Sequence, residues 1–207
     1  GFSDADAKAL TDAMDNRRAV RLLSDMQTGA NQIDALAGDD DRAQLILDGN
    51  KFDRLYRPPL RLVIAGKGPV VAASAEIARA SDIEVHVIST EDDTRAQAES
   101  FGAKTYKTMR PELIDTWTAV ATLFHEHELE IPVLGAAMTS DAFYIGALGR
   151  STHADRVSRF IEDGYSEDAV KRIKGPLGIS IGSRNPPEIA ISMIAEVLQT
   201  YRARFAV

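Results

Sequence analysis

The second part of the chain alternates short apolar strands with helical segments, and this alternation constrains the fold more than any other feature. Residues 60–65 form an apolar, β-branched run, as expected for a parallel strand covered on both faces. Further strands are predicted at 83–88, 118–124 and 143–145, and helices at 70–80, 94–101, 131–138 and 152–162. This spacing predicts an α/β domain with a doubly wound, Rossmann-like parallel sheet.

The last helix has the clearest start signal. Asn185 is a suitable N-cap, Pro186 occupies the first helical position, and Glu188 follows three residues after the cap. Residues 178–182, directly before it, are predicted to form a strand interrupted by glycine.

The first 57 residues have a different pattern. An amphipathic helix is predicted around Leu10, a strand at 19–23, and a second helix from the acidic run 39–41 to Gly49. The pair Pro58-Pro59 interrupts this pattern. We therefore expect a small N-terminal α+β segment, 1–57, and a larger Rossmann-like domain, 58–207.

Composition excludes several kinds of function. The chain has no cysteine, which rules out disulfides, thiolate nucleophiles, cysteine-ligated zinc and iron–sulfur clusters within it. A net charge of −7 argues against nucleic acid as a partner, because phosphate neutralisation needs a basic surface. No apolar stretch is long enough to span a bilayer, and the acidic first segment does not resemble a signal peptide, so a cytoplasmic location is expected.

The turn after the first strand of the larger domain is the first candidate site. Gly66 and Gly68 would let the backbone approach a pyrophosphate, and the following helix would supply N–H donors. Val71 stands where a dinucleotide-binding fingerprint has its third glycine, and no acid directly ends the second strand. The alternative is a tight strand-to-helix turn that holds no ligand.

A second candidate site follows the strand at 143–145. Gly146 and Gly149 flank the end of this strand, and Arg150, Ser151 and Thr152 then lie at a helix N-terminus. Backbone amides and a guanidinium group in this arrangement can hold an anion. The alternative is a capped helix with surface arginines.

Two further segments are predicted to border the same pocket. Gly182 and Arg184 follow the predicted strand at 178–182, where turn formation and helix capping are the alternative roles. His125 follows the strand at 118–124 and is suited to acid–base chemistry, since imidazole titrates near neutral pH.

Metal binding is an open alternative near His125. A His-x-His pair with His127 could bind a metal with Glu126 or Glu130 as a further ligand. Clusters of this kind are more often solvated loops, so no metal site is predicted.

Two long motifs carry a resemblance to a known family. The segments GALGRSTHADR (146–156) and GPLGISIGSRNPPEIAISMIAEVL (175–198) resemble the C-terminal Rossmann-type domain of the XdhC/CoxI family. The resemblance implies a maturation factor for molybdenum hydroxylases such as xanthine dehydrogenase and carbon monoxide dehydrogenase. It also implies binding of molybdenum cofactor, a pterin that carries a phosphate or a dinucleotide, and its delivery to an apo-enzyme. A cysteine desulfurase partner would sulfurate the cofactor.

This chain departs from the family pattern at the presumed ligand crevice. Pro69 follows the glycine turn where the family has a histidine, and Ser180 replaces an acid. The family's Leu-Gly-Ser-Arg-Arg-x-His pattern is one residue short in 148–153.

The leading hypothesis is a non-catalytic chaperone for molybdenum cofactor that serves a molybdenum hydroxylase. The alternatives are an NAD(P)-dependent oxidoreductase and a degenerate scaffold that binds only a protein partner. The apolar final helix suggests a homodimer. The predicted cofactor-binding residues are Gly66, Gly68, His125, Gly146, Gly149, Arg150, Ser151, Thr152, Gly182 and Arg184.

Overall fold

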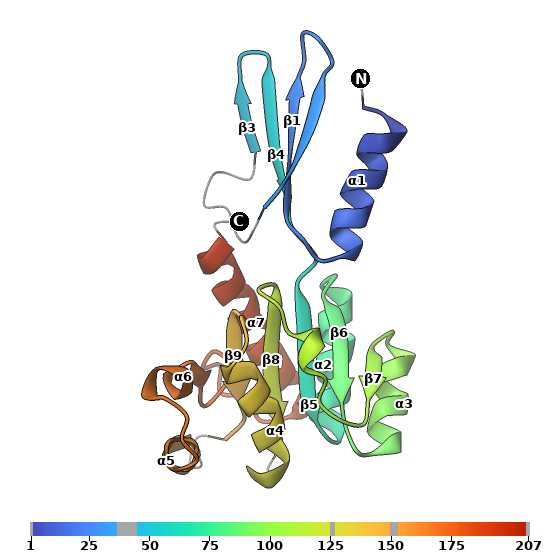
Figure 1. Cartoon of the computed structure of the whole chain (residues 1–207). Coiled ribbons are helices and arrows are strands. Elements are labelled where there is room, and N and C mark those ends of the chain that lie inside the picture. Colours follow the sequence, from blue (N-terminus) through green and yellow to red (C-terminus); the bar gives the residue numbers. More distant parts are fainter. Residues whose placement is uncertain (1, 37–44, 125–126, 150–152, 206–207) are drawn as a thin grey trace. The chain divides into compact units, whose positions relative to one another are not determined.

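A computed structural model describes residues 2–36, 45–124, 127–149 and 153–205 (Figure 1). The chain divides into two compact units. One is Leu60–Tyr201, and the other comprises the chain up to Pro59 together with the chain from Arg202 on. Within the described ranges, no helix combines the length and the hydrophobicity needed to cross a membrane.

The larger unit is built around a parallel sheet, whose strands in the described part of the chain are six in number. They are β5 (Arg61–Gly66), β6 (Glu84–Ile88), β7 (Lys104–Tyr106), β8 (Thr118–Leu123), β9 (Tyr144–Ala147) and β10 (Ile173–Lys174). Their order is β10-β9-β8-β5-β6-β7, and every neighbouring pair is parallel. The chain starts in the middle of the sheet, extends to β7, and then crosses back to add β8, β9 and β10. This is the doubly wound Rossmann order, so the predicted fold class is confirmed.

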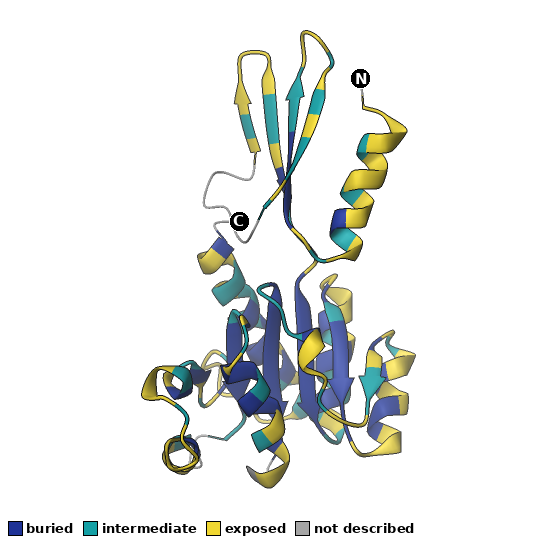
Figure 2. Cartoon of the chain, viewed as in Figure 1, coloured by how far each residue is buried: buried dark blue, intermediate teal, exposed yellow. Residues whose placement is uncertain are grey.

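Helices cover both faces of this sheet. They are α2 (Pro69–Ala80), α3 (Asp92–Ser100), α4 (His127–Met138), α5 (His153–Glu162), α6 (Glu167–Lys171) and α7 (Pro186–Phe205), with a 3₁₀ turn, η1, at Pro111–Leu113. On β5, Leu62 and Ile64 pack with α2, α3 and α7, whereas Val63 and Ala65 pack with α4, α5 and α6. All of β5 is buried, as the dark central strands in Figure 2 show. Burial on both faces explains the apolar run Leu62–Ala65 within it.

The start of α7 confirms the predicted capping, but the strand predicted before it is wrong. The Glu188 backbone N–H donates to Asn185 Oδ1 at 3.0 Å. Residues 178–182 form no strand, because Gly178 and Gly182 have φ angles of +94° and +74°, which interrupt an extended backbone. This segment instead packs along α7, where the Ile179 N–H donates to a backbone carbonyl.

The smaller unit consists of a helix and an antiparallel sheet of order β2-β1-β4-β3. Its described elements are α1 (Asp4–Asp15), β1 (Val20–Asp25), β2 (Asn31–Ala35), β3 (Leu45–Asp48) and β4 (Lys51–Tyr56). The helix predicted up to Gly49 is wrong at its C-terminal end, because residues 45–48 pair with β4. Gly49 and Asn50 form a two-residue hairpin loop, with a φ of +56° at Gly49, and this hairpin signal outweighs the helical pattern. The acidic run 39–41 lies outside the described residues.

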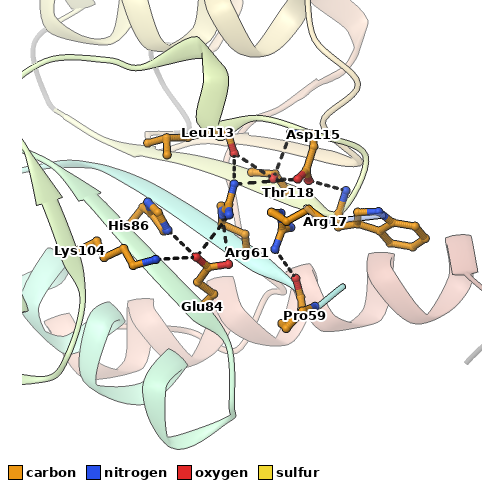
Figure 3. Close-up of polar contacts among 10 residues, drawn as sticks. Arg17, Pro59, Arg61, Glu84, His86, Lys104, Leu113, Asp115 and Thr118 are labelled. Atoms are coloured by element: carbon orange, nitrogen blue, oxygen red, sulfur yellow. Dashed lines mark hydrogen bonds and ion pairs between the residues drawn. The ribbon is translucent and has the colours of Figure 1, made fainter. Parts of the chain in front are cut away.

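Charged side chains meet at the amino-terminal edge of the parallel sheet (Figure 3). Arg61 Nε donates to Glu84 Oε2 at 3.2 Å, and Arg61 Nη1 donates to the Leu113 carbonyl at 2.9 Å. A ring nitrogen of the buried His86 lies 2.8 Å from Glu84 Oε1. The hydrogen bond with His86, followed by the interaction with Arg61, holds the pKa of Glu84 well below its usual range, against the opposing effect of burial.

We expect Glu84→Gln to reduce the free energy of unfolding at pH 7 by about 1–3 kcal/mol, because it removes a charged acceptor from Arg61 and His86. A lowered folded-state pKa contributes stability above the unfolded-state value, about 4.3, and loses it as the pH falls toward the folded value. The difference in the free energy of unfolding between the unmodified chain and Glu84→Gln should therefore stay constant above about pH 5.5 and become smaller below about pH 4.5. Urea unfolding across this pH range measures it, and the exposed Glu112→Gln serves as the control. A gap that stayed unchanged in acid would contradict the assigned pKa direction.

Candidate functional site at the carboxyl edge of the sheet

The turns that follow several parallel strands meet at one edge of the larger unit. In the pairing register, Gly66 lies opposite Leu123, and Thr122 lies opposite Ala147. The Leu177 N–H donates to the Ala147 carbonyl at 3.0 Å, which brings the segment after β10 to the same edge. Because neighbouring strands are about 4.8 Å apart, the ends of β5 and β9 are separated by about 10 Å. Ligands of doubly wound sheets bind at this edge, next to the point where the strand order reverses, which here lies between β5 and β8.

The glycine turn after β5 is tightly packed. A Cβ atom at Gly66 would lie 2.9 Å from both Leu123 Cβ and Val71 Cγ2. Val71 is fully buried and fills the space between strand and helix. Gly66 is therefore required by the contact between β5, β8 and α2, whether or not a ligand approaches.

The backbone donor at Gly68 is already in use. Gly68 has a φ of +75° and caps α2, and its N–H donates to Thr94 Oγ1 at 2.9 Å. The Thr94 hydroxyl in turn donates to Glu91 Oε2 at 2.9 Å. A pyrophosphate bound to this amide would have to displace Thr94 and would meet the charge of Glu91. This turn is thus poorly prepared to hold a dinucleotide phosphate.

Gly146 has a packing explanation. It is buried within β9, and the phenol ring of Tyr144 lies over its Cα, where a Cβ would collide with the ring. The Tyr144 hydroxyl donates to Glu196 Oε2 at 2.7 Å, and the Gly178 N–H donates to the same oxygen at 2.6 Å. Burial, followed by the hydrogen bond to Glu196, raises the pKa of Tyr144. These contacts join β9, the segment after β10 and α7 near the candidate site.

The structure describes only part of the predicted ligand set. Gly149, directly after β9, has a φ of +95°, a conformation that favours glycine. Gly182 and Arg184 are both exposed in the segment between β10 and α7. The Arg184 N–H donates to Glu188 Oε2 at 2.6 Å, so its backbone takes part in helix capping. The predicted ligands that lie outside the described residues are His125, Arg150, Ser151 and Thr152.

A buried ion pair joins α4 to α5, the helices that follow β8 and β9. Arg156 Nε donates to Glu130 Oε1 at 2.7 Å, Arg156 Nη2 donates to Glu130 Oε2 at 3.1 Å, and both side chains are 2 % exposed. Arg156 Nη2 also donates to the Leu148 carbonyl at 2.9 Å, and the Thr122 hydroxyl lies 3.4 Å from Glu130 Oε2. This network links β8, α4, α5 and the end of β9.

Glu130 is a candidate metal ligand by its sequence position, but its carboxylate is occupied by Arg156. The described part of the chain holds no group of three or more His, Cys, Asp or Glu side chains arranged to bind a metal. His125 and Glu126 lie outside that part.

Two buried nitrogens near this network lack partners among the described residues. They are Arg156 Nη1 and His153 Nδ1. Burial, followed by the nearby positive charge of Arg156, lowers the pKa of His153, so its neutral form is favoured. The ring of His153 lies against Gly175, where any side chain would collide with it. Arg156 Nη1 is a buried donor without an acceptor among the described residues, and such a donor suits an anionic group.

Sequence reasoning did not single out the Glu130–Arg156 pair as important for the site. A signal for it exists, because each charged residue occupies an apolar position of its helix. Arg156 lies one turn before the buried Phe160, and Glu130 precedes the buried Val133 and Leu134. A charge at a core position of an amphipathic helix indicates a buried partner.

The family model for the XdhC Rossmann domain matches residues 62–197. The chain belongs to this family. The resemblance to XdhC expected from the motifs at 146–156 and 175–198 is therefore confirmed, and the matched range corresponds to the doubly wound sheet and most of α7.

Individual relatives agree with this XdhC assignment. The chain is 33% identical over 149 residues to the "Molybdenum cofactor insertion chaperone PaoD" of Escherichia coli (strain K12), covering 72% of this chain and 42% of that protein. It is 28% identical over 166 residues to a probable subunit of xanthine dehydrogenase from Bacillus subtilis (strain 168), covering 76% of this chain and 48% of that protein. The chain thus spans less than half the length of either relative.

A solved structure shares the fold. The crystal structure of a protein described as a xanthine dehydrogenase from Bacillus halodurans superposes with a TM-score of 0.70 at 21% sequence identity. The match covers 95% of this chain and 64% of that one. At this identity the comparison supports the fold alone.

Proposed function

We propose that this chain is a maturation factor that binds molybdenum cofactor at the carboxyl edge of its parallel sheet and passes it to the apo form of a molybdenum hydroxylase. The observation that carries the proposal is the meeting of the turns after β5, β8, β9 and β10 at one edge of an XdhC Rossmann domain. PaoD, a relative at 33% identity, is named as an insertion chaperone for this cofactor. The hydroxylase would be of the xanthine or carbon monoxide dehydrogenase type.

The residues at this edge fit a ligand with an acidic group. Molybdenum cofactor is a pterin that carries a phosphate or a dinucleotide, and the edge holds a buried guanidinium nitrogen, Arg156 Nη1, that has no acceptor among the described residues. A phosphate next to Gly149 would have a glycine backbone and the Arg156 guanidinium close by, because Arg156 also donates to the Leu148 carbonyl. We propose that Arg150, Ser151 and Thr152 complete the anion site and that His125 borders the pterin.

The proposed role is one of binding and transfer. The chain has no cysteine, so it cannot itself carry a persulfide. Sulfuration of the bound cofactor would therefore come from a cysteine desulfurase, which we propose as a second partner beside the apo-hydroxylase.

The structure supports an NAD(P)-dependent oxidoreductase less well than the sequence does. The Gly68 amide is occupied by Thr94, and the Glu91 carboxylate lies directly behind that hydroxyl. We accordingly expect NADH and NADPH to leave the fluorescence of the protein unchanged. Tight binding with hydride transfer would overturn the proposed function.

The direct test is titration of the purified chain with molybdenum cofactor, followed by transfer to an apo-hydroxylase. We expect micromolar or tighter binding and recovery of hydroxylase activity. Arg150→Ala should weaken binding by about tenfold or more, because a charge-assisted contact to the phosphate is lost. Arg159→Ala, an exposed change on α5, is the matched control and should bind normally. Absence of both micromolar binding and transfer would refute the proposal.

A further inference from the structure

A pocket lies beside the candidate site, on the face of the sheet that α4 covers. It has a volume of about 210 Å³ and is formed where β6, β7 and β8 end, against the first turns of α4. Phe124, directly after β8, is part of its wall, so the pocket opens next to the point where the strand order reverses. The pocket is formed entirely by residues of the larger unit.

Its inner walls are apolar and come from both the sheet and the helix. Ile88 and Phe124 at the strand ends are 4% and 6% exposed, and Val133 on α4 is 3% exposed. Met109, Leu129 and Pro132 are the other apolar residues of the lining. Pockets that accept a whole drug-sized ligand usually measure about 300–1,000 Å³. This smaller pocket suits one ring system of a larger molecule, with the remainder of the ligand extending along the sheet edge.

The rim of the pocket carries hydrogen-bonding groups. The exposed Thr90 and Thr108 hydroxyls are not committed to another described residue. Pro132 has no N–H, so the carbonyl of Glu128, four residues earlier in α4, receives no bond from it. Both of these α4 residues line the pocket. The Glu128 carbonyl and two hydroxyls beside an apolar slot can pair with the polar edge of a heteroaromatic ring whose faces contact the walls, whereas an alkyl chain offers them no hydrogen-bonding partner.

We infer that this pocket takes the planar heteroaromatic ring of the ligand, either a pterin or the nucleobase of a nucleotide form of the cofactor. The inference rests on the proposed function for the identity of the whole ligand. The ring would lie between Phe124 and the first turns of α4, with its edge toward Thr90, Thr108 and the Glu128 carbonyl. Its phosphate would extend toward the turns after β5 and β9, which share this edge.

Three small probes test the pocket in the full chain: 6-hydroxymethylpterin, cytidine monophosphate and guanosine monophosphate. Calorimetry would measure affinity, and amide chemical shifts would locate binding. We expect at least one probe to bind and to shift the amides of Ser89, Thr90, Lys107 and Thr108. Binding of the pterin but not of the nucleotides would assign the ring to the pterin, and the reverse would assign it to the nucleobase. Absence of these shifts with all three probes would overturn the inference.

Variants that fill the pocket give an independent test. Leu129 is 40% exposed, so Leu129→Trp should fold normally and narrow the pocket. The affinity for the probe should then fall by at least about tenfold. Thr108→Trp should also narrow the pocket, from the loop after β7, and replaces the first variant if Leu129→Trp is destabilised. Ile161→Trp, at a position 44% exposed on α5 and outside the pocket, is the matched control and should bind the probe normally.

Cofactor titration of the same variants separates the two proposals. If Leu129→Trp and Thr108→Trp bind molybdenum cofactor as tightly as the unmodified chain, the ring assignment is wrong and the proposed function stands. If the chain fails to bind the cofactor but still holds a ring probe at this pocket, the proposed function is wrong and the ring pocket stands.

Discussion

Replacement of Glu130 by alanine is expected to lower the free energy of unfolding of the larger unit by about 3–5 kcal/mol, because it leaves a charged guanidinium buried without its carboxylate. Arg156 is 2% exposed and donates two hydrogen bonds to Glu130, at 2.7 and 3.1 Å. Its further hydrogen bond, to the Leu148 carbonyl, cannot neutralise the charge. Urea denaturation monitored by circular dichroism measures the loss.

The matched control for this change lies on the same helix as Arg156. Arg159→Ala removes an exposed guanidinium and should change stability by less than about 0.5 kcal/mol. Replacing both members of the pair by apolar residues, Glu130→Leu with Arg156→Met, should recover much of the lost stability, since neither charge is then buried alone. If Glu130→Ala unfolds at the same urea concentration as the unmodified chain, the pair between α4 and α5 does not stabilise the larger unit.

The second large effect is expected at Gly178. Its φ is +94°, and an added Cβ would collide with Ser192 Oγ and lie 3.2 Å from the Met193 backbone nitrogen. Gly178→Ala therefore combines a left-handed backbone with a collision against α7, and we expect a loss of about 2–4 kcal/mol. Its N–H bond to Glu196, which also holds Tyr144, would be disturbed as well.

Gly182 provides the comparison, because its φ of +74° is similar but nothing lies within 4 Å of its Cβ position. Gly182→Ala should show only the backbone strain, about 1–2 kcal/mol. Urea unfolding of the two variants separates the collision from the strain. Equal losses at the two positions would mean that the contact between Gly178 and α7 is unimportant.

The parallel sheet could be predicted because its signal is local and repeated. β5, β6, β8 and β9 are short, largely apolar runs that alternate with helical segments, and burial on both faces of the sheet favours such runs. The edge strand β7 (Lys104–Tyr106) is polar and was not predicted. The start of α7 was equally predictable, because Asn185, Pro186 and Glu188 lie within four residues of one another. Both motifs that indicated the XdhC family are also continuous in sequence.

Errors arose where the outcome depended on a partner distant in the chain or on backbone conformation. Leu45–Asp48 has residues that suit either a helix or a strand, and its pairing with β4 decided between them. Residues 178–182 have alternating isoleucines, yet positive φ angles at two glycines and contacts with α7 prevent a strand.

The sequence by itself determined the fold class, the strands β5, β6, β8 and β9 with the helices that follow them, and the family, but not β7, α6 or β10. Only the tertiary structure decided how the site is held and which of its groups are already in use. It paired Glu130 with Arg156 and directed the Gly68 amide to Thr94. It also explained Gly146 by the ring of Tyr144. The physical reason is that periodicity and capping act within a few residues, whereas hydrogen-bond partners and close packing are chosen among side chains that only folding brings together.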